Sequence, residues 1–243
     1  MKRKIIKNKI HKQFLKEISR LDLKKNKEER LWVQKYLGSN KPTKCIKTGE
    51  IIKIAKKYSK ENNFNKNELI NLLDSLFSKS TTFEEMDFAG RLIGVNPEIK
   101  KQINPEKLDY WLNFTHGWAE TDLLCQSNFA SDELLSNWDA WKKLLIKFSK
   151  DKNVHKRRAG LVLLTKSVRT SEDKKLSDLA FKNVDSLKSE SDILITKAIS
   201  WILRSLIKNH KKEVSSYLKK NKESLPKIAV REVTNKLQTG KKN

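Results

Sequence analysis

Residues 195–206 read Ile-Thr-Lys-Ala-Ile-Ser-Trp-Ile-Leu-Arg-Ser-Leu, and the spacing of their apolar side chains indicates the fold class. Ile195, Ile199, Ile202 and Leu206 recur three and four residues apart, which places them on one face of a helix. The same period runs through almost every other segment, and no segment shows the period of two that is typical of a strand. The sequence therefore predicts an all-α protein.

Short polar clusters divide the periodic segments into a series of helices. We expect helices over residues 4–20, 27–37, 43–60, 65–79, 82–94, 105–114, 117–128, 131–149 (with a break near Trp138), 153–169, 172–188, 191–209, 211–221 and 224–237. Links of two to six residues favour stacked antiparallel helical hairpins, a HEAT-like or armadillo-type α-α superhelix with a basic concave groove. A compact irregular bundle is the alternative. We expect a single domain over residues 1–243, with residues 1–25 as a packed basic helix or a basic arm.

The charge of the chain is large and unevenly distributed. The 243 residues carry 53 Lys and Arg against 29 Asp and Glu, a net charge of +24. Residues 1–60 are net +15, residues 61–140 are net −8 and residues 141–243 are net +17. Such an excess attracts a polyanion, with nucleic acid first and an anionic membrane a distant second. A solvated lysine surface without a partner is the alternative interpretation.

Several classes of protein do not fit this sequence. It has no apolar run of 18 residues, and no apolar stretch of the kind found in signal peptides follows the basic N-terminus. Cys45 and Cys125 have no CxxC spacing, and the four histidines lack the spacing of metal ligands. We therefore expect a cytoplasmic protein without a metal or cofactor, nucleoid-associated if its polyanionic partner is DNA. We expect a monomer, because a solenoid closes its own core.

Residues 117–128 carry a carboxylate on an otherwise apolar face. At about 100° per residue, Trp118, Asp122, Cys125 and Phe129 fall on one side of the helix. A buried carboxylate needs a cation, hydrogen bonds or a wet cleft. Asp122 is therefore either part of a structural ion pair or a functional carboxylate beside an aromatic wall.

Two more helices carry cations in unexpected places. The helix expected over 153–169 has three cations near its start, which are Lys156, Arg157 and Arg158. Both arginines fall near its apolar stripe. They either extend to solvent, pair with Asp122, or bind a phosphate. In the second, Trp201 shares one side of residues 191–209 with three cations, which are Lys197, Arg204 and Lys208. Trp201 is either packed under lysine stems or a stacking surface for nucleic acid.

Taken together, these segments resemble the AlkD-like family of DNA alkylation repair proteins, which are built from HEAT-like repeats. The resemblance rests on the WxxxD of Trp118 and Asp122, the RRA of residues 157–159 and the KAISWILR of residues 197–204. The early turn at Tyr36-Leu37-Gly38 and the closing residues 230–234, VREVT, are also similar. The early turn departs from the family at residues 39–45, where the family usually has a valine, a proline and then an arginine.

The resemblance implies a DNA glycosylase that excises cationic N3- and N7-alkylated purines from duplex DNA. Asp122 would match the catalytic carboxylate, Trp118 the aromatic residue before it, Arg158 the arginine near it and Trp201 the second aromatic residue. We expect DNA contacts from the cations around them, which are Lys156, Arg157, Lys197, Arg204 and Lys208. Because some relatives with this fold bind DNA without excising bases, a non-catalytic HEAT-like protein that recognises damaged or branched DNA is the alternative. An RNA- or protein-binding helical scaffold is a third.

Overall fold

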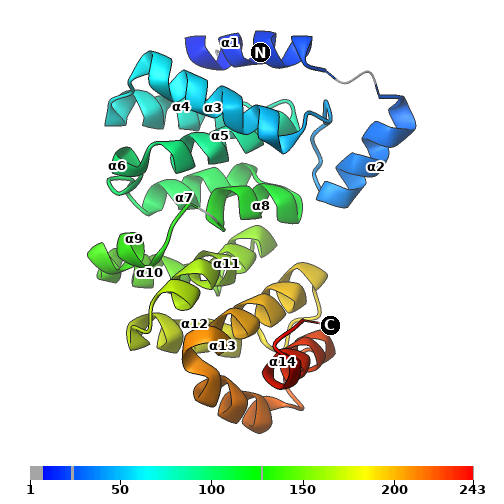
Figure 1. Ribbon diagram of the computed structural model, residues 1–243, viewed down its shortest axis with the longest axis vertical. Helices are drawn as coiled ribbons and strands as arrows, with labels where there is room; N and C mark the ends of the chain where they lie inside the picture. The colour runs from blue at the N-terminus through cyan, green and yellow to red at the C-terminus, as the bar shows by residue number, and fades with distance from the viewer. Residues whose placement is uncertain (1–7, 23–24, 127, 243) are drawn as a thin grey trace. The chain divides into compact units, whose positions relative to one another are not determined.

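The protein is described here from a computed structural model, in which residues 8–22, 25–126 and 128–242 are placed. Every regular element in those ranges is a helix (Figure 1). The prediction of an all-α fold built from helical repeats is therefore confirmed. The chain divides into two compact units, Met1–Leu124 and Cys125–Asn243. We expected one domain over residues 1–243, and that expectation stays a prediction.

The first unit contains seven α-helices and most of an eighth within its described residues. They are α1 (Lys9–Arg20), α2 (Lys27–Leu37), α3 (Thr48–Asn62), α4 (Lys66–Ser78), α5 (Phe83–Val95), α6 (Pro97–Lys100), α7 (Glu106–Trp111), the 3-10 turn η1 (Leu112–Phe114) and α8 (Gly117–Cys125). Helix α5 packs against both α3 and α4, and α1 packs on α4 (Figure 1). The rings of Phe14 and Phe88 stack with centroids 3.9 Å apart, which joins α1 to the core under α5.

The second unit is built around one buried helix. Its elements are α9 (Ser131–Ser136), α10 (Trp138–Phe148), α11 (Val154–Thr170), α12 (Lys174–Leu187), α13 (Ile193–Asn221) and α14 (Lys227–Thr239). Helix α11 packs against α9, α10, α12 and α13, and α14 packs against α13. Because α11 is covered by neighbours along its length, even its Thr165 and Ser167 are buried.

Local capping explains why several helices begin and end where the sequence predicts. Helix α2 follows a capping box, in which Asn26 accepts from the amide of Glu29 and the Glu29 carboxylate accepts from the amide of Asn26. It ends at Gly38, whose φ of 67° lies in the left-handed region that favours glycine. The Asp192 carboxylate caps α13 by accepting from the amide of Leu194.

Several helix boundaries differ from the predictions. The helix expected over 43–60 begins at Thr48, because Thr43 and the Lys44 amide bind the Glu84 carboxylate and hold this segment out of a helix. The helices expected over 191–209 and 211–221 are one element, kinked at His210, where φ is −131° and ψ is 42°. Residues 97–100, which lie between the helices expected over 82–94 and 105–114, form the short helix α6.

The N-terminal segment is a packed helix over its described part. In α1, His11, Phe14 and Ile18 are fully buried, so residues 9–20 follow the packed-helix alternative rather than the basic arm. Residues 4–7 of the helix expected over 4–20 lie outside the described residues. No helix in the described ranges is long and apolar enough to cross a membrane.

Candidate functional site

Trp118 and Asp122 lie one turn apart on α8, in the first unit. Both side chains are half-buried, in contrast to Cys125, which is fully buried. Helix α8 ends at Cys125, so Phe129, which we expected on the same face, lies beyond it and packs on Trp141 in the second unit. Of the four residues predicted on that face, Trp118 and Asp122 are therefore the two that are partly open.

A contact between two glycines fixes the start of α8. Gly117 begins the helix with a φ of 77°, and Gly38 ends α2 with a φ of 67°. A Cβ at Gly117 would lie 2.1 Å from the carbonyl oxygen of Gly38, so only glycine lets the two backbones approach this closely. The early turn that carries part of the family resemblance thus rests directly against the helix that carries Asp122.

The same contact orients the indole of Trp118. Its Nε1–H donates a 2.8 Å hydrogen bond to the backbone oxygen of Tyr36. The ring of Tyr36 meets the Trp118 ring edge to face, with centroids 5.7 Å apart and planes at 87°. Because one bond and one ring contact act on the same indole, its plane is fixed without burying it.

Glu120 is a structural carboxylate that the sequence analysis missed. It lies between Trp118 and Asp122 in the sequence, and its side chain is fully buried. Its carboxylate accepts hydrogen bonds from the hydroxyl of Ser39 and, at 2.7 Å, from the amide of His116. The Lys41 ammonium lies 3.4 Å from its second oxygen. Three groups from both sides of the glycine contact therefore converge on one carboxylate, which holds the early turn against α8.

Helix α5 approaches α8 beside Asp122 through another glycine. A Cβ at Gly90 would lie 2.7 Å from the backbone oxygen of Leu123. Any side chain here would push α8 outward, so Gly90 sets the depth at which Asp122 sits.

In the second unit, the two arginines of α11 are held by protein groups. The Arg157 guanidinium pairs with both oxygens of Glu190, at 2.8 Å and 3.1 Å, and also donates to the backbone oxygens of Asp151 and Lys152. Arg158 is buried and donates a 2.7 Å hydrogen bond to the backbone oxygen of Leu194, at the start of α13. Neither side chain extends freely to solvent, and Lys156 is also buried. That these residues contact DNA stays a prediction.

The side of α13 that carries Trp201 is partly open. Trp201 is half-buried, whereas Lys197 and Lys208 are exposed. The Arg204 guanidinium lies 3.3 Å from the Glu232 carboxylate of α14 and 3.2 Å from the hydroxyl of Ser200. The VREVT segment of the family resemblance therefore supplies, through Glu232, the acid that holds Arg204.

Glu232 also receives a 2.6 Å hydrogen bond from Ser200 and lies 3.2 Å from the Lys242 ammonium. Burial raises the pKa of the Glu232 carboxyl, but the bond from Ser200 and the charges of Lys242 and Arg204 outweigh it, so the pKa falls below its ordinary value of 4.5. Ionised Glu232 therefore stabilises the fold at neutral pH, and this contribution is lost as the pH falls through the lowered pKa.

We expect Glu232→Gln to lower the free energy of unfolding by about 1–3 kcal/mol at neutral pH, because a charged hydrogen-bond acceptor is removed from a buried site. The difference from the wild type should shrink as the pH falls below 4.5. Urea unfolding followed by circular dichroism, at neutral pH and at a pH below 4.5, measures this difference in the free energy of unfolding. Glu223→Gln, at an exposed position after α13, is the matched control. An equal loss in both variants would contradict the role of Glu232.

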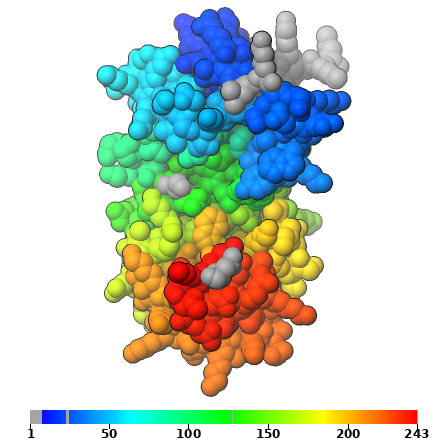
Figure 2. All heavy atoms as spheres, turned by 45° about the vertical axis from the view of Figure 1, so that its right-hand side comes forward, coloured from blue at the N-terminus to red at the C-terminus, as the bar shows by residue number. Residues whose placement is uncertain are grey.

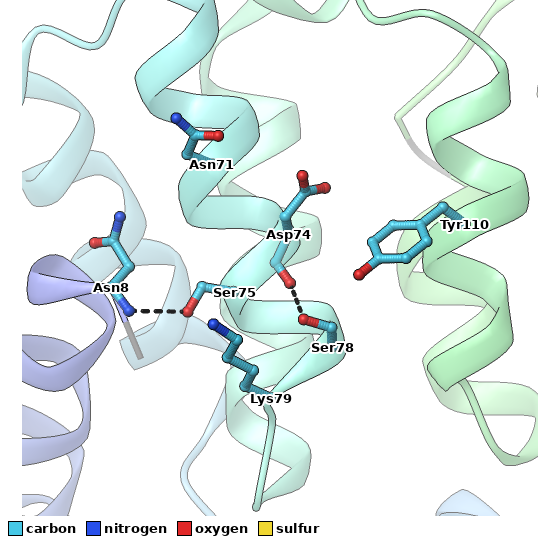
Figure 3. Close-up of a pocket in the computed structure, with 7 residues that line it drawn as sticks. All are labelled: Asn8, Asn71, Asp74, Ser75, Ser78, Lys79 and Tyr110. Carbon is cyan, nitrogen blue, oxygen red and sulfur yellow. Dashed lines mark hydrogen bonds between the residues drawn. The ribbon is translucent and has the colours of Figure 1, made fainter. Parts of the chain in front are cut away.

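A polar cavity of about 310 Å³ lies elsewhere in the first unit (Figure 3). The side chains of α4 line it, with Asn8 on one side and Tyr110 on the other. Behind it the His11 ring joins Ser75, at 2.9 Å, to the buried Glu85 carboxylate, at 2.5 Å. This network fixes α1 on α4 and α5. None of the residues predicted for the site lines the cavity.

No group of three or more His, Cys, Asp or Glu in the placed ranges has the arrangement of a metal site.

Comparison with known proteins identifies the family. The family model of the DNA alkylation repair enzymes matches residues 17–237. No curated protein matches the sequence. A solved structure of a predicted DNA alkylation repair enzyme from Enterococcus faecalis is similar, with a TM-score of 0.71 over 90% of this chain and 99% of that one, at 20% identity. At that identity the likeness establishes the fold, and the family follows from the family model. The chain belongs to the DNA alkylation repair enzyme family.

Proposed function

We propose that the protein is a monofunctional DNA glycosylase that hydrolyses the N-glycosidic bond of cationic N3- and N7-alkylated purines in duplex DNA. Membership of the repair family supports DNA as the partner and a role in repair. The half-buried Asp122 carboxylate, one turn from a fixed indole, carries the proposal for the chemistry. We place this activity in the cytoplasm, on the nucleoid, with the protein acting as a monomer.

The chemistry follows from the charge on the lesion. An alkylated purine is already cationic, so it leaves without a general acid. Positive charge then develops on the deoxyribose, as in an oxocarbenium ion. A fixed carboxylate beside the sugar stabilises that charge and orients the attacking water. In this proposal Asp122 has that role.

The indole of Trp118 takes a second role. Its electron-rich face attracts a cationic nucleotide, and a ring held by Tyr36 loses little conformational freedom when the ligand binds. Since Trp118 and Asp122 are on the same helix, the rigid start of α8 fixes both groups together.

Residues of the second unit are proposed to act on the same DNA. Trp201 is the second aromatic residue and Arg158 the arginine that the resemblance assigns to the reaction. Lys197 and Lys208 are exposed and are proposed to contact phosphates. Arg157, Arg204 and the buried Lys156 are weaker candidates for DNA contact. Arg157 and Arg204 already have acidic partners, and the position of Lys156 removes most of its side chain from solvent.

We expect the double variant Lys197→Ala and Lys208→Ala to weaken DNA binding and to reduce the slope of log K against log salt by about 2, since each phosphate contact contributes about 0.9. Fluorescence anisotropy with a labelled duplex at salt concentrations of about 50 to 200 mM measures this slope. Lys53→Ala and Lys101→Ala, two exposed lysines of the first unit, are the control. An unchanged slope would remove both lysines from the interface.

The proposed function is tested by treating duplex DNA with a methylating agent and measuring the free bases that the purified protein releases. We expect release of N3- and N7-methylated purines, leaving an abasic site whose strand breaks only on heating with alkali. Salt-sensitive DNA binding without any release would overturn the glycosylase proposal in favour of a non-catalytic DNA-binding protein. Equal binding of structured RNA would favour the scaffold interpretation.

A further inference from the structure

The most exposed large apolar side chains in the described residues lie on α2. Trp32 is 67% exposed and Tyr36 is 60% exposed, and both belong to this one helix. No side chain of α2 is fully buried. In Figure 2 the helix lies at the surface of the first unit, in the blue between the darkest blue of α1 and the cyan of α3. An aromatic surface of this kind on a soluble helix indicates an interaction site.

The two rings form an ordered stack. Trp32 and Tyr36 are four residues apart, and their planes are within 5° of parallel with centroids 5.7 Å apart. Tyr36 in turn meets Trp118 edge to face. Trp32, Tyr36 and Trp118 therefore form a continuous aromatic surface that ends one turn from Asp122.

The surface is rigid rather than loosely attached. Trp118 bonds to the backbone of Tyr36, the glycine contact follows two residues later, and Glu120 accepts from Ser39 next to it. Rings that are fixed before the ligand arrives bind a flat partner at a small entropic cost.

The charge around the surface favours a polyanion over an apolar protein partner. Residues 25–47 carry seven basic and two acidic side chains. One of those acids, Glu29, caps α2, and Lys35 lies on the same side of the helix as Trp32 and Tyr36. Aromatic faces among cations are what bases and phosphates of single-stranded DNA bind.

We propose that the Trp32–Tyr36 stack binds an unpaired nucleobase of the DNA duplex. The ligand class, DNA, rests on the proposed function. The base stacks on the open face of the rings, and the surrounding lysines contact the flanking phosphates. The protein then prefers duplexes in which a base is already unpaired, because unstacking that base is already complete.

The test uses duplexes without any alkylated base, in which a fluorescent base, 2-aminopurine, lies opposite an abasic analogue, together with fully paired duplexes. Stacking on an aromatic ring quenches 2-aminopurine. We expect the wild type to quench the unpaired base and to bind that duplex more tightly than the paired one. Trp32→Ala and Tyr36→Ala should each lose most of the quenching and about tenfold in affinity for the unpaired duplex. Trp32→Ala, which leaves the contact between Tyr36 and Trp118 in place, should change binding of the paired duplex little.

Two controls make the result specific. Trp32→Phe keeps a ring and should restore most of the quenching. Leu31→Ala removes an equally exposed aliphatic side chain, 53% exposed, from the same helix and should change nothing. Because these side chains are exposed, the variants should melt at the wild-type temperature, as circular dichroism will show.

Unchanged quenching in Trp32→Ala would overturn the inference, and so would an equal loss of quenching in Leu31→Ala. The third contradicting result is a wild-type dimer, seen by sedimentation, that Trp32→Ala dissociates, because it would assign the surface to a second copy of the chain. The outcome is separable from that for the proposed function. If ring-dependent quenching is found without any release of methylated bases, the glycosylase proposal fails and the stacking surface stands. If release is normal and quenching is absent, only the stacking surface fails.

Discussion

Replacing Asp122 with Asn is expected to abolish the release of alkylated purines while DNA binding is retained. The amide has nearly the same shape as the carboxylate but no charge, so it cannot stabilise the positive charge that develops on the sugar. Loss of one well-placed electrostatic group costs about 10²–10³ in rate. The measurement is the single-turnover rate of base release, with binding followed separately by anisotropy.

The control for Asp122→Asn is the same chemical change at an exposed acid, Asp139, which lies on α10. Asp139→Asn alters the net charge equally and should release bases at the wild-type rate. The account would be wrong about the carboxylate if Asp122→Asn were as fast as Asp139→Asn. A variant that lost DNA binding together with release would instead show that Asp122 is structural.

Gly117→Ala is expected to have the largest effect on stability. The new Cβ would lie 2.1 Å from the carbonyl oxygen of Gly38, and the φ of 77° is unfavourable for any residue with a side chain. The left-handed conformation costs about 1–2 kcal/mol and overpacking about 1–3 kcal/mol. We therefore expect the free energy of unfolding to fall by about 2–5 kcal/mol, or the early turn to move away from α8. Either outcome releases Trp118 from the backbone of Tyr36 and should slow base release.

Gly49→Ala is the matched control for this prediction. Gly49 lies in the first turn of α3, and a Cβ there would meet no atom within 4 Å. Alanine at this position should leave stability unchanged or raise it by up to about 1 kcal/mol, since it favours the helix. Thermal melting of both variants distinguishes them. Equal melting temperatures for Gly117→Ala and the wild type would show that the glycine contact does not hold α8.

Most helices could be predicted because their signals are local. The helix over 27–37 was predicted with the bounds of α2, since its capping box and terminal glycine lie within a few residues of its ends. The start of α3 was not, because the side chain that keeps Thr43 out of a helix is Glu84, 41 residues away. The polar stretch around His210 predicts a break between helices, but such a stretch is equally compatible with the kink that the structure has there.

The candidate site was predictable only in part, for the same reason. The four-residue spacing of Trp118 and Asp122 is visible in the sequence, and so is the acidity of Glu120. What Glu120 binds is not, because Ser39 is 81 residues away. Similarly, the early turn at residues 36–38 is visible in the sequence as a motif, but its contact with Gly117, which is far away in the sequence, is visible only in the folded structure. The sequence leaves three alternatives open for Arg157 and Arg158, which are solvent, Asp122 or a phosphate, and it does not reveal that Arg157 pairs with Glu190, 33 residues away.

The most direct measurement is single-turnover release from a duplex that contains one 7-methylguanine, with protein in excess. Our account predicts that free 7-methylguanine accumulates far faster with the wild type than by spontaneous loss, and that Asp122→Asn returns the rate to nearly the spontaneous value. Release at the spontaneous rate by a wild type that binds the duplex fully would contradict the account.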